Sequence, residues 1–117
     1  MSQKLDLSYL EEITGGDNEI MLEMIDIFLT ESETAIQELR HIYEQKNWQA
    51  LGAQAHKLKP TLLYVGLKEI HAITLKLEKN AKQGSMPEMY DQWIQQITDG
   101  YHDIREDLEL VKKELSS

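Results

Sequence analysis

The chain has 117 residues, of which 41% are hydrophobic, and a formal net charge of −9 at pH 7. This composition is typical of one folded domain with a single core, and the negative charge argues against a nucleic-acid binder. The absence of cysteine excludes disulfides, thiol nucleophiles and thiolate metal sites. Because no apolar run approaches the roughly 20 residues that cross a bilayer, and the first residues lack the apolar segment of a signal peptide, we expect a cytoplasmic domain without a membrane partner.

Helical patterns dominate the chain, and no alternation of apolar and polar residues is long enough to predict a strand. A short helix is expected from Leu7 to Ile13, stopped by the glycine pair at 15 and 16. Asp17 is expected to cap a long second helix that extends to about Gln45. Its predicted apolar stripe consists of Ile20, Met24, Ile27, Phe28, Ala35, Leu39 and Ile42.

The third helix follows Asn47 as a cap and has the clearest periodicity, with apolar residues at alternating spacings of three and four. These residues are Trp48, Leu51, Ala55, Leu58, Leu62 and Val65. Gly66 predicts a break before a fourth helix from Leu67 to about Gln83. A capping box at Ser85–Glu88, with proline in the first turn, predicts the start of a last helix that extends to about Leu115.

Four substantial helices with short connections predict an all-α fold, an up-down-up-down antiparallel four-helix bundle with a short extra N-terminal helix. We interpret residues 1–117 as a single domain, since no repeat or composition shift divides the sequence. A coiled-coil dimer is the alternative for long helices, but the apolar stripes are broader than a strict heptad seam, so a monomer is expected.

His56 is the most reactive-looking residue of the third helix. It follows Ala55 and is therefore rotated by about 100° from the centre of the apolar stripe, which predicts an exposed ring. Its helical neighbours three and four residues away include Gly52, Lys59 and Pro60, so small side chains and one cation surround the imidazole. Such a ring nitrogen is suited to accept a phosphoryl group, although a lone histidine on a helix is more often a passive surface residue.

Positive charge is concentrated around this histidine. The segment 57–82 contains six of the chain's twelve basic residues, and its only acids are Glu69 and Glu78. The lysines are Lys57, Lys59, Lys68, Lys76, Lys79 and Lys82. This pattern suits a small anion or an acidic partner pocket, and a solvated helix face is the alternative that the sequence leaves open.

The segment from Ala55 to Lys59, with Gly66-Leu67 ten and eleven residues after the histidine, resembles the signature of histidine-containing phosphotransfer (HPt) domains of bacterial phosphorelays. The resemblance extends through residues 7–10 and Phe28-Leu29 and covers most of the chain. It implies a four-helix bundle whose exposed histidine carries a phosphoryl group between aspartates of receiver domains, without kinase activity.

The resemblance also implies roles for individual residues. His56 matches the phosphoacceptor, Lys59 the lysine that neutralises phosphate charge, and Glu78 a side chain that orients the imidazole through its other nitrogen. The partner-binding surface is expected to include Phe28, Leu29, Lys57, Leu63, Gly66 and Lys82. Pro60 departs from the glycine or small residue usual in this family, and it predicts a local bend at His56.

The expected partners are receiver domains of response regulators and a hybrid sensor histidine kinase. We expect no cofactor, since the chain has no glycine-rich phosphate loop and no acidic cluster suited to Mg²⁺, which the receiver would supply. Two alternatives remain. One is a helical interaction module with the same fold but no transfer, and the other is a metal-dependent enzyme, for which Glu38-x-x-His41 provides one of the two required motifs. We predict no metal ligand.

Overall fold

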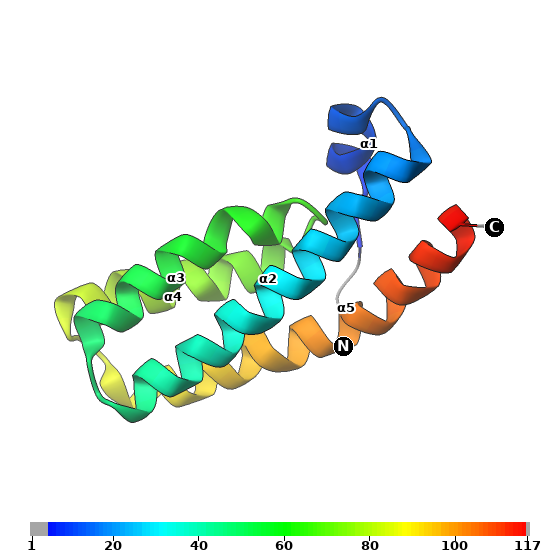
Figure 1. The fold of residues 1–117 in the computed structure, drawn as a ribbon. Helices are drawn as coiled ribbons and strands as arrows, with labels where there is room; N and C mark the ends of the chain where they lie inside the picture. The colour runs from blue at the N-terminus through cyan, green and yellow to red at the C-terminus, as the bar shows by residue number, and fades with distance from the viewer. Residues whose placement is uncertain (1–4, 117) are drawn as a thin grey trace.

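The computed structural model describes residues 5–116, and within this range the secondary structure is entirely helical (Figure 1). The elements are α1 (Ser8–Thr14), α2 (Asn18–Glu44), α3 (Trp48–Leu63), α4 (Lys68–Gln83), a short 3₁₀ helix η1 (Pro87–Met89) and α5 (Tyr90–Ser116). Among the described residues, no helix is long and apolar enough to cross a membrane.

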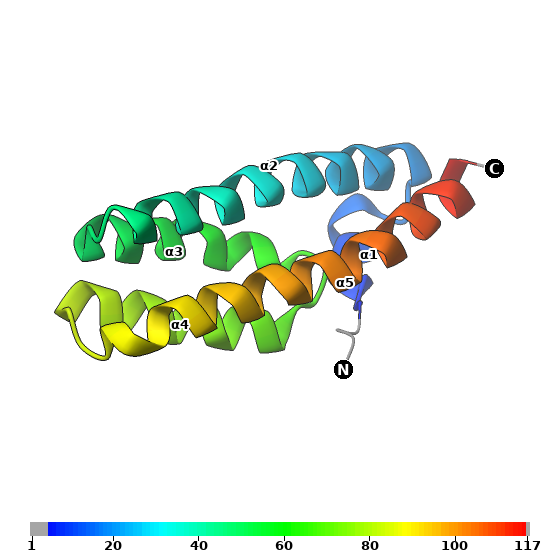
Figure 2. The same cartoon turned by 90° about the horizontal axis from the view of Figure 1, so that it is seen from below.

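Helices α2 to α5 form the bundle. The packed pairs are α2 with α3, α3 with α4, α4 with α5, and α5 with α2, so each helix contacts its neighbours along the chain and the ring closes. Figure 2 shows that α2 and α5 extend well past the ends of α3 and α4, and that α1 lies at this extended end. The predicted all-α antiparallel bundle with a short extra helix is confirmed.

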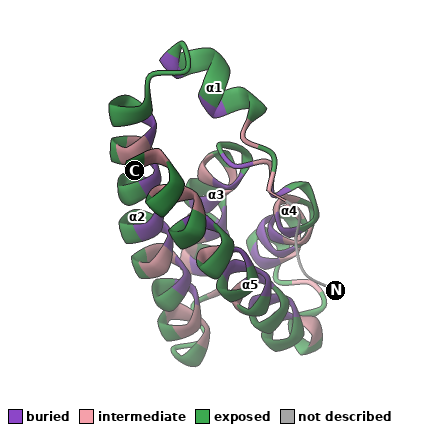
Figure 3. Cartoon of the chain, turned by 90° about the vertical axis from the view of Figure 1, so that its right-hand side faces the viewer, coloured by how far each residue is buried: buried purple, intermediate pink, exposed green. Residues whose placement is uncertain are grey.

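The core face of α3 is the one that the sequence predicts. All the apolar residues of the predicted α3 stripe are buried except Trp48, which is half-buried. Figure 3 shows the buried residues on the inner sides of the bundle helices and the exposed residues on their outer sides. The core residues Ile70, Leu77 and Ala81 of α4 and Ile97, Ile104 and Leu108 of α5 are also buried. Because helix periodicity fixes which residues share a face, the face opposite the core can be read directly from these stripes.

The predicted stripe of α2 is wrong in its N-terminal half. Ile20 and Ile27 are exposed, whereas Met21 and Ile25 are buried. The whole buried face is Met21, Ile25, Phe28, Leu29, Ser32, Ile36 and Leu39. Apolar residues occupy more than one side of this part of α2, so periodicity alone does not decide which side faces α5.

The helix starts follow the predicted caps at two of three places. Asp17 Oδ1 accepts a hydrogen bond from the Ile20 N–H at 3.1 Å, and Asn47 Oδ1 accepts one from Ala50 at 3.1 Å. The prediction of a capping box at Ser85 is wrong. The Ser85 hydroxyl instead donates to Asn80 Oδ1 at 2.8 Å, because the chain turns back at the end of α4 before entering η1.

The turn between α3 and α4 holds the N-terminal segment in place. Gly66 has a φ of +76°, and a Cβ there would lie 2.4 Å from the Cβ of Asp6. The Asp6 N–H donates to the Val65 carbonyl at 3.0 Å, and the ring of Tyr9 in α1 stacks on that of Tyr64, with 5.9 Å between centroids. Glycine is thus required at 66 for both its conformation and its lack of a side chain.

Candidate functional site

His56 lies in the middle of α3 on the face turned away from the core. The side chain is 64% exposed, whereas its neighbour Ala55 is fully buried. The exposure expected from the apolar periodicity is therefore observed. Pro60 lies one turn later and α3 continues through it to Leu63. The bend that we expect at His56 stays a prediction.

The imidazole of His56 rests on the carboxylate of Glu78, which comes from the neighbouring helix α4. His56 Nδ1 lies 2.6 Å from Glu78 Oε2, and the Glu78 side chain is 7% exposed. An ionised carboxylate can only accept hydrogen bonds, so Nδ1 must carry the proton and donate it. The neutral ring then has an unprotonated Nε2 with a free electron pair.

Two lysines share the same carboxylate. Lys59 Nζ lies 2.5 Å from Glu78 Oε1, and Lys82 Nζ lies 3.1 Å from Oε2. Burial raises the pKa of Glu78, but the hydrogen bonds from Lys59, Lys82 and His56 outweigh it and lower that pKa from 4.5 to about 2. Glu78 is therefore ionised at neutral pH even though it is buried.

Gly52 allows α3 and α4 to approach closely enough for these contacts. It is buried, and a Cβ there would lie 2.7 Å from Lys82 Cγ and 3.3 Å from the Glu78 carbonyl oxygen. The side chain of Gln49, one turn earlier, donates to the Lys82 carbonyl at 2.8 Å. From its helical spacing, Gly52 is expected to be a surface neighbour of His56. That interpretation is wrong, because Gly52 forms the contact between the two helices.

Phe28 and Leu29 do not belong to an exposed surface beside His56. They are only 2% and 8% exposed, because this side of α2 turns toward α5. The Phe28 ring packs 6.3 Å from the ring of Tyr101, whose hydroxyl donates to the Leu29 carbonyl at 2.9 Å. The prediction that they line the docking surface is therefore corrected, and both are core residues.

Leu63 does lie on the exposed surface, two turns after His56 on the same face of α3. Pro60, Leu63 and Tyr64 form one wall of an open recess of about 680 Å³ between α3 and α1. Tyr9 and Glu12 of α1 form the opposite wall. Gly66 also borders the recess, and its contact there is with Asp6; its assignment to the partner-binding surface stays a prediction.

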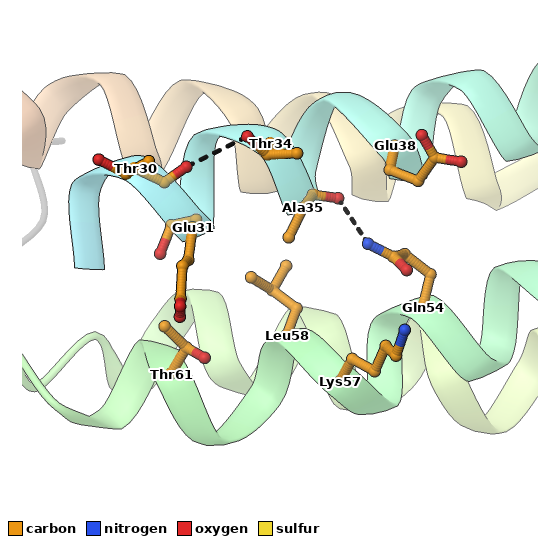
Figure 4. A pocket seen from close by; sticks show the side chains of 10 residues that line it. Thr30, Glu31, Thr34, Ala35, Glu38, Gln54, Lys57, Leu58 and Thr61 are labelled. Carbon is orange, nitrogen blue, oxygen red and sulfur yellow. Dashed lines mark hydrogen bonds between the residues drawn. The ribbon is translucent and has the colours of Figure 1, made fainter. Parts of the chain in front are cut away.

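Lys57 points into a second recess on the other side of α3. This recess has a volume of about 570 Å³ and lies between α2 and α3 (Figure 4). In it the Gln54 amide donates to the Ala35 carbonyl at 3.1 Å, and Glu31 and Thr61 face one another across the gap. His56 therefore lies on a ridge with one recess near the α1 end of α3 and another along α2.

Sequence reasoning missed Gly52 and the paired tyrosines Tyr9 and Tyr64. A glycine in the middle of a helix costs about 1 kcal/mol relative to alanine, so Gly52 could have been recognised as a packing contact. Tyr9 and Tyr64 have no such signal in the sequence.

The metal-site alternative rests on Glu38 and His41, which lie on exposed turns of α2. The described residues contain no group of three or more side chains placed to hold a metal ion.

Comparisons with known proteins agree with this fold. The Hpt domain family matches residues 23–113. The fold is similar to histidine-containing phosphotransfer protein B from Pseudomonas aeruginosa PAO1, with a TM-score of 0.85, 20% identity, and coverage of 94% of this chain and 95% of the other. A rice structure described as a histidine-containing phosphotransfer protein has a TM-score of 0.74 and 16% identity, covering 95% of this chain and 79% of the rice chain.

A relative in sequence is the phosphorelay intermediate protein rdeA of Dictyostelium discoideum, 22% identical over 115 residues. The match covers 98% of this chain and 42% of that relative's length.

The bundle of α2 to α5, with an exposed imidazole on α3 that is bound by a carboxylate through Nδ1, defines together with the family match a histidine phosphotransfer domain of phosphorelay signalling. With more than half of its length matched, the chain belongs to the Hpt domain family. Members of this class carry phosphoryl groups and work with receiver domains and kinases, as the sequence signature implies.

Proposed function

We propose that His56 accepts a phosphoryl group from the phosphorylated aspartate of a receiver domain and passes it to the aspartate of another receiver. The observation that supports this role most directly is the exposed ring with its Nδ1 bound to Glu78, because that bond leaves Nε2 free to react. The domain is then a carrier that completes two half-reactions and has no kinase activity of its own.

The transfer step balances without an external reactant. The Nε2 lone pair attacks phosphorus, an N–P bond forms, and the P–O bond to the receiver aspartate breaks with its electron pair leaving on the carboxylate. The proton on Nδ1 stays in place, so the ring of the product carries positive charge beside the Glu78 carboxylate. Phosphoryl transfer depends mainly on positioning and charge compensation, and the receiver would supply Mg²⁺ and the acidic residues that hold it.

The docking surface that we propose is the ridge of α3 together with the recess beside α1. Leu63, Tyr64 and Pro60 provide apolar contact near His56, and Tyr9 extends it onto α1. Lys57 and Lys82 flank this surface on opposite sides, and both are exposed. The phosphorylation pocket of a receiver is acidic, so these charges favour its approach and correct orientation.

The test is acceptance of phosphate from a phosphorylated receiver domain, followed by mapping of the acid-labile phosphate. We expect His56→Gln to abolish acceptance and the matched variant His102→Gln, which alters another exposed histidine on α5, to retain it. Thermal melts of both variants show whether folding is unaffected. Phosphate on a residue other than His56 would contradict the proposal, and a folded wild type that accepts no phosphate from any receiver would favour a non-transferring interaction module.

A further inference from the structure

Lys59 and Lys82, the two lysines of the site, bind the Glu78 carboxylate. The Lys59 side chain is 20% exposed and Glu78 lies against it, whereas the His56 ring is 64% exposed. In the free protein both ammonium groups therefore bind the carboxylate that accepts the Nδ1 proton. Their direct partner is the carboxylate.

A buried carboxylate without a cation draws a proton to itself or to its neighbour, because an unpaired charge is costly away from water. If Glu78 took the proton, its O–H would donate to Nδ1 and the ring proton would move to Nε2. If His56 took it, the imidazolium would carry protons on both nitrogens. Either way Nε2 is blocked, and the lone pair needed for attack on phosphorus is lost.

We propose that Lys59 and Lys82 keep Nε2 of His56 free of a proton, by supplying the positive charge that Glu78 would otherwise obtain from a second proton. This inference rests on the proposed phosphoryl acceptance at His56 and assigns the lysines a positioning role that precedes the arrival of the phosphoryl group. Gly52 contributes by letting α4 pack closely against α3, which brings the Glu78 carboxylate within reach of His56 and Lys59.

The charged groups that act on this pair come from two helices. His56 and Lys59 belong to α3, and Glu78 and Lys82 belong to α4. On the α5 side of α4, Tyr90 donates its hydroxyl to the carbonyls of Asn80 and Ser85. Helix α2 approaches α3 from the opposite side, where Glu31, Glu38 and Lys57 line the recess.

The experiment is ¹⁵N NMR of the imidazole nitrogens of His56 in the full chain, through the neutral pH range, for wild type, Lys59→Gln, Lys82→Gln and the double variant. In wild type we expect Nε2 to be unprotonated and Nδ1 protonated. In the double variant we expect Nε2 to be protonated. We also expect the pH midpoint of phosphoryl acceptance to shift upward by about one pH unit, so that below this midpoint the population with a free Nε2 is about tenfold smaller than in wild type. Lys59→Arg keeps the charge and is expected to restore the wild-type spectrum.

The matched control is Lys79→Gln, which removes one positive charge from an exposed position next to Glu78 on α4. It is expected to leave the His56 spectrum and the pH midpoint unchanged. If the double variant slows transfer but keeps the wild-type spectrum and midpoint, the lysines serve the phosphoryl group directly and the inference is overturned. If wild-type His56 accepts no phosphate although the spectra behave as expected, the proposed function fails and the assignment of the lysines stands.

Discussion

Gly52 and Lys82 set the distance between α3 and α4, since a Cβ on Gly52 would lie 2.7 Å from Lys82 Cγ and 3.2 Å from its backbone nitrogen. This close approach places Glu78 under the imidazole of His56. The geometry of the candidate site therefore depends on Gly52, which has no side chain that could bond to the ring or to its carboxylate.

Gly52→Ala is the direct test of this contact. Alanine is better than glycine in a helix by about 1 kcal/mol, but overpacking in a close contact costs about 1–3 kcal/mol. We expect no gain in the free energy of unfolding and slower phosphoryl acceptance, because α4 must move away from α3. Ala72→Gly, at an exposed position of α4, is the control and is expected to lose about 1 kcal/mol without changing acceptance. A Gly52→Ala protein that is more stable and equally active would show that the contact is unimportant.

The pKa of Glu78 predicts a defined pH dependence of stability. Because the folded-state pKa is lowered from 4.5 to about 2, the stabilising contribution of Glu78 is complete above pH 4.5 and is lost as the pH falls through 2. We expect the free energy of unfolding of wild type to decrease more steeply across this window than that of Glu78→Gln. Urea unfolding at several pH values measures the difference, and equal slopes would mean that the lysines do not stabilise the ionised carboxylate.

Receiver binding is expected to have an apolar part and a salt-dependent part. Raising the ionic strength should weaken binding, because screening reduces the attraction between the lysines and an acidic pocket, while the apolar part persists. Leu63→Glu should abolish much of the remaining affinity. The control is Leu110→Glu, an equally drastic change at an exposed leucine of α5. Unchanged affinity of the Leu63 variant in a binding titration would place the docking surface elsewhere.

Gly66→Ala separates two costs at the turn between α3 and α4. A left-handed backbone costs a non-glycine residue about 1–2 kcal/mol, and the same cost applies to Gly84→Ala, where φ is +65° and no atom lies within 4 Å of the new Cβ. At Gly66 the new Cβ would also meet Asp6. We therefore expect Gly66→Ala to be the more destabilising variant in chemical unfolding. Equal losses would indicate that the N-terminal segment moves aside freely.

The sequence determined the fold class and the position of His56. The apolar residues of α3 recur at spacings of three and four and leave His56 outside the stripe, so its exposure follows from helix geometry without knowledge of the neighbouring helices. The caps Asp17 and Asn47 are equally local, because each bonds to a backbone N–H three residues away. The residues around His56 also pointed to Lys59, and the family resemblance pointed to Glu78.

Only the tertiary structure decided what those residues contact. The choice of buried face in α2 depends on α5, which is why Phe28 and Leu29 are core residues and not part of the docking surface. The contacts of His56 and Lys59 with Glu78 depend on how closely α3 and α4 approach at Gly52. Periodicity within one helix specifies a direction from its axis, but the distance and register between two helices are set by the packing of both.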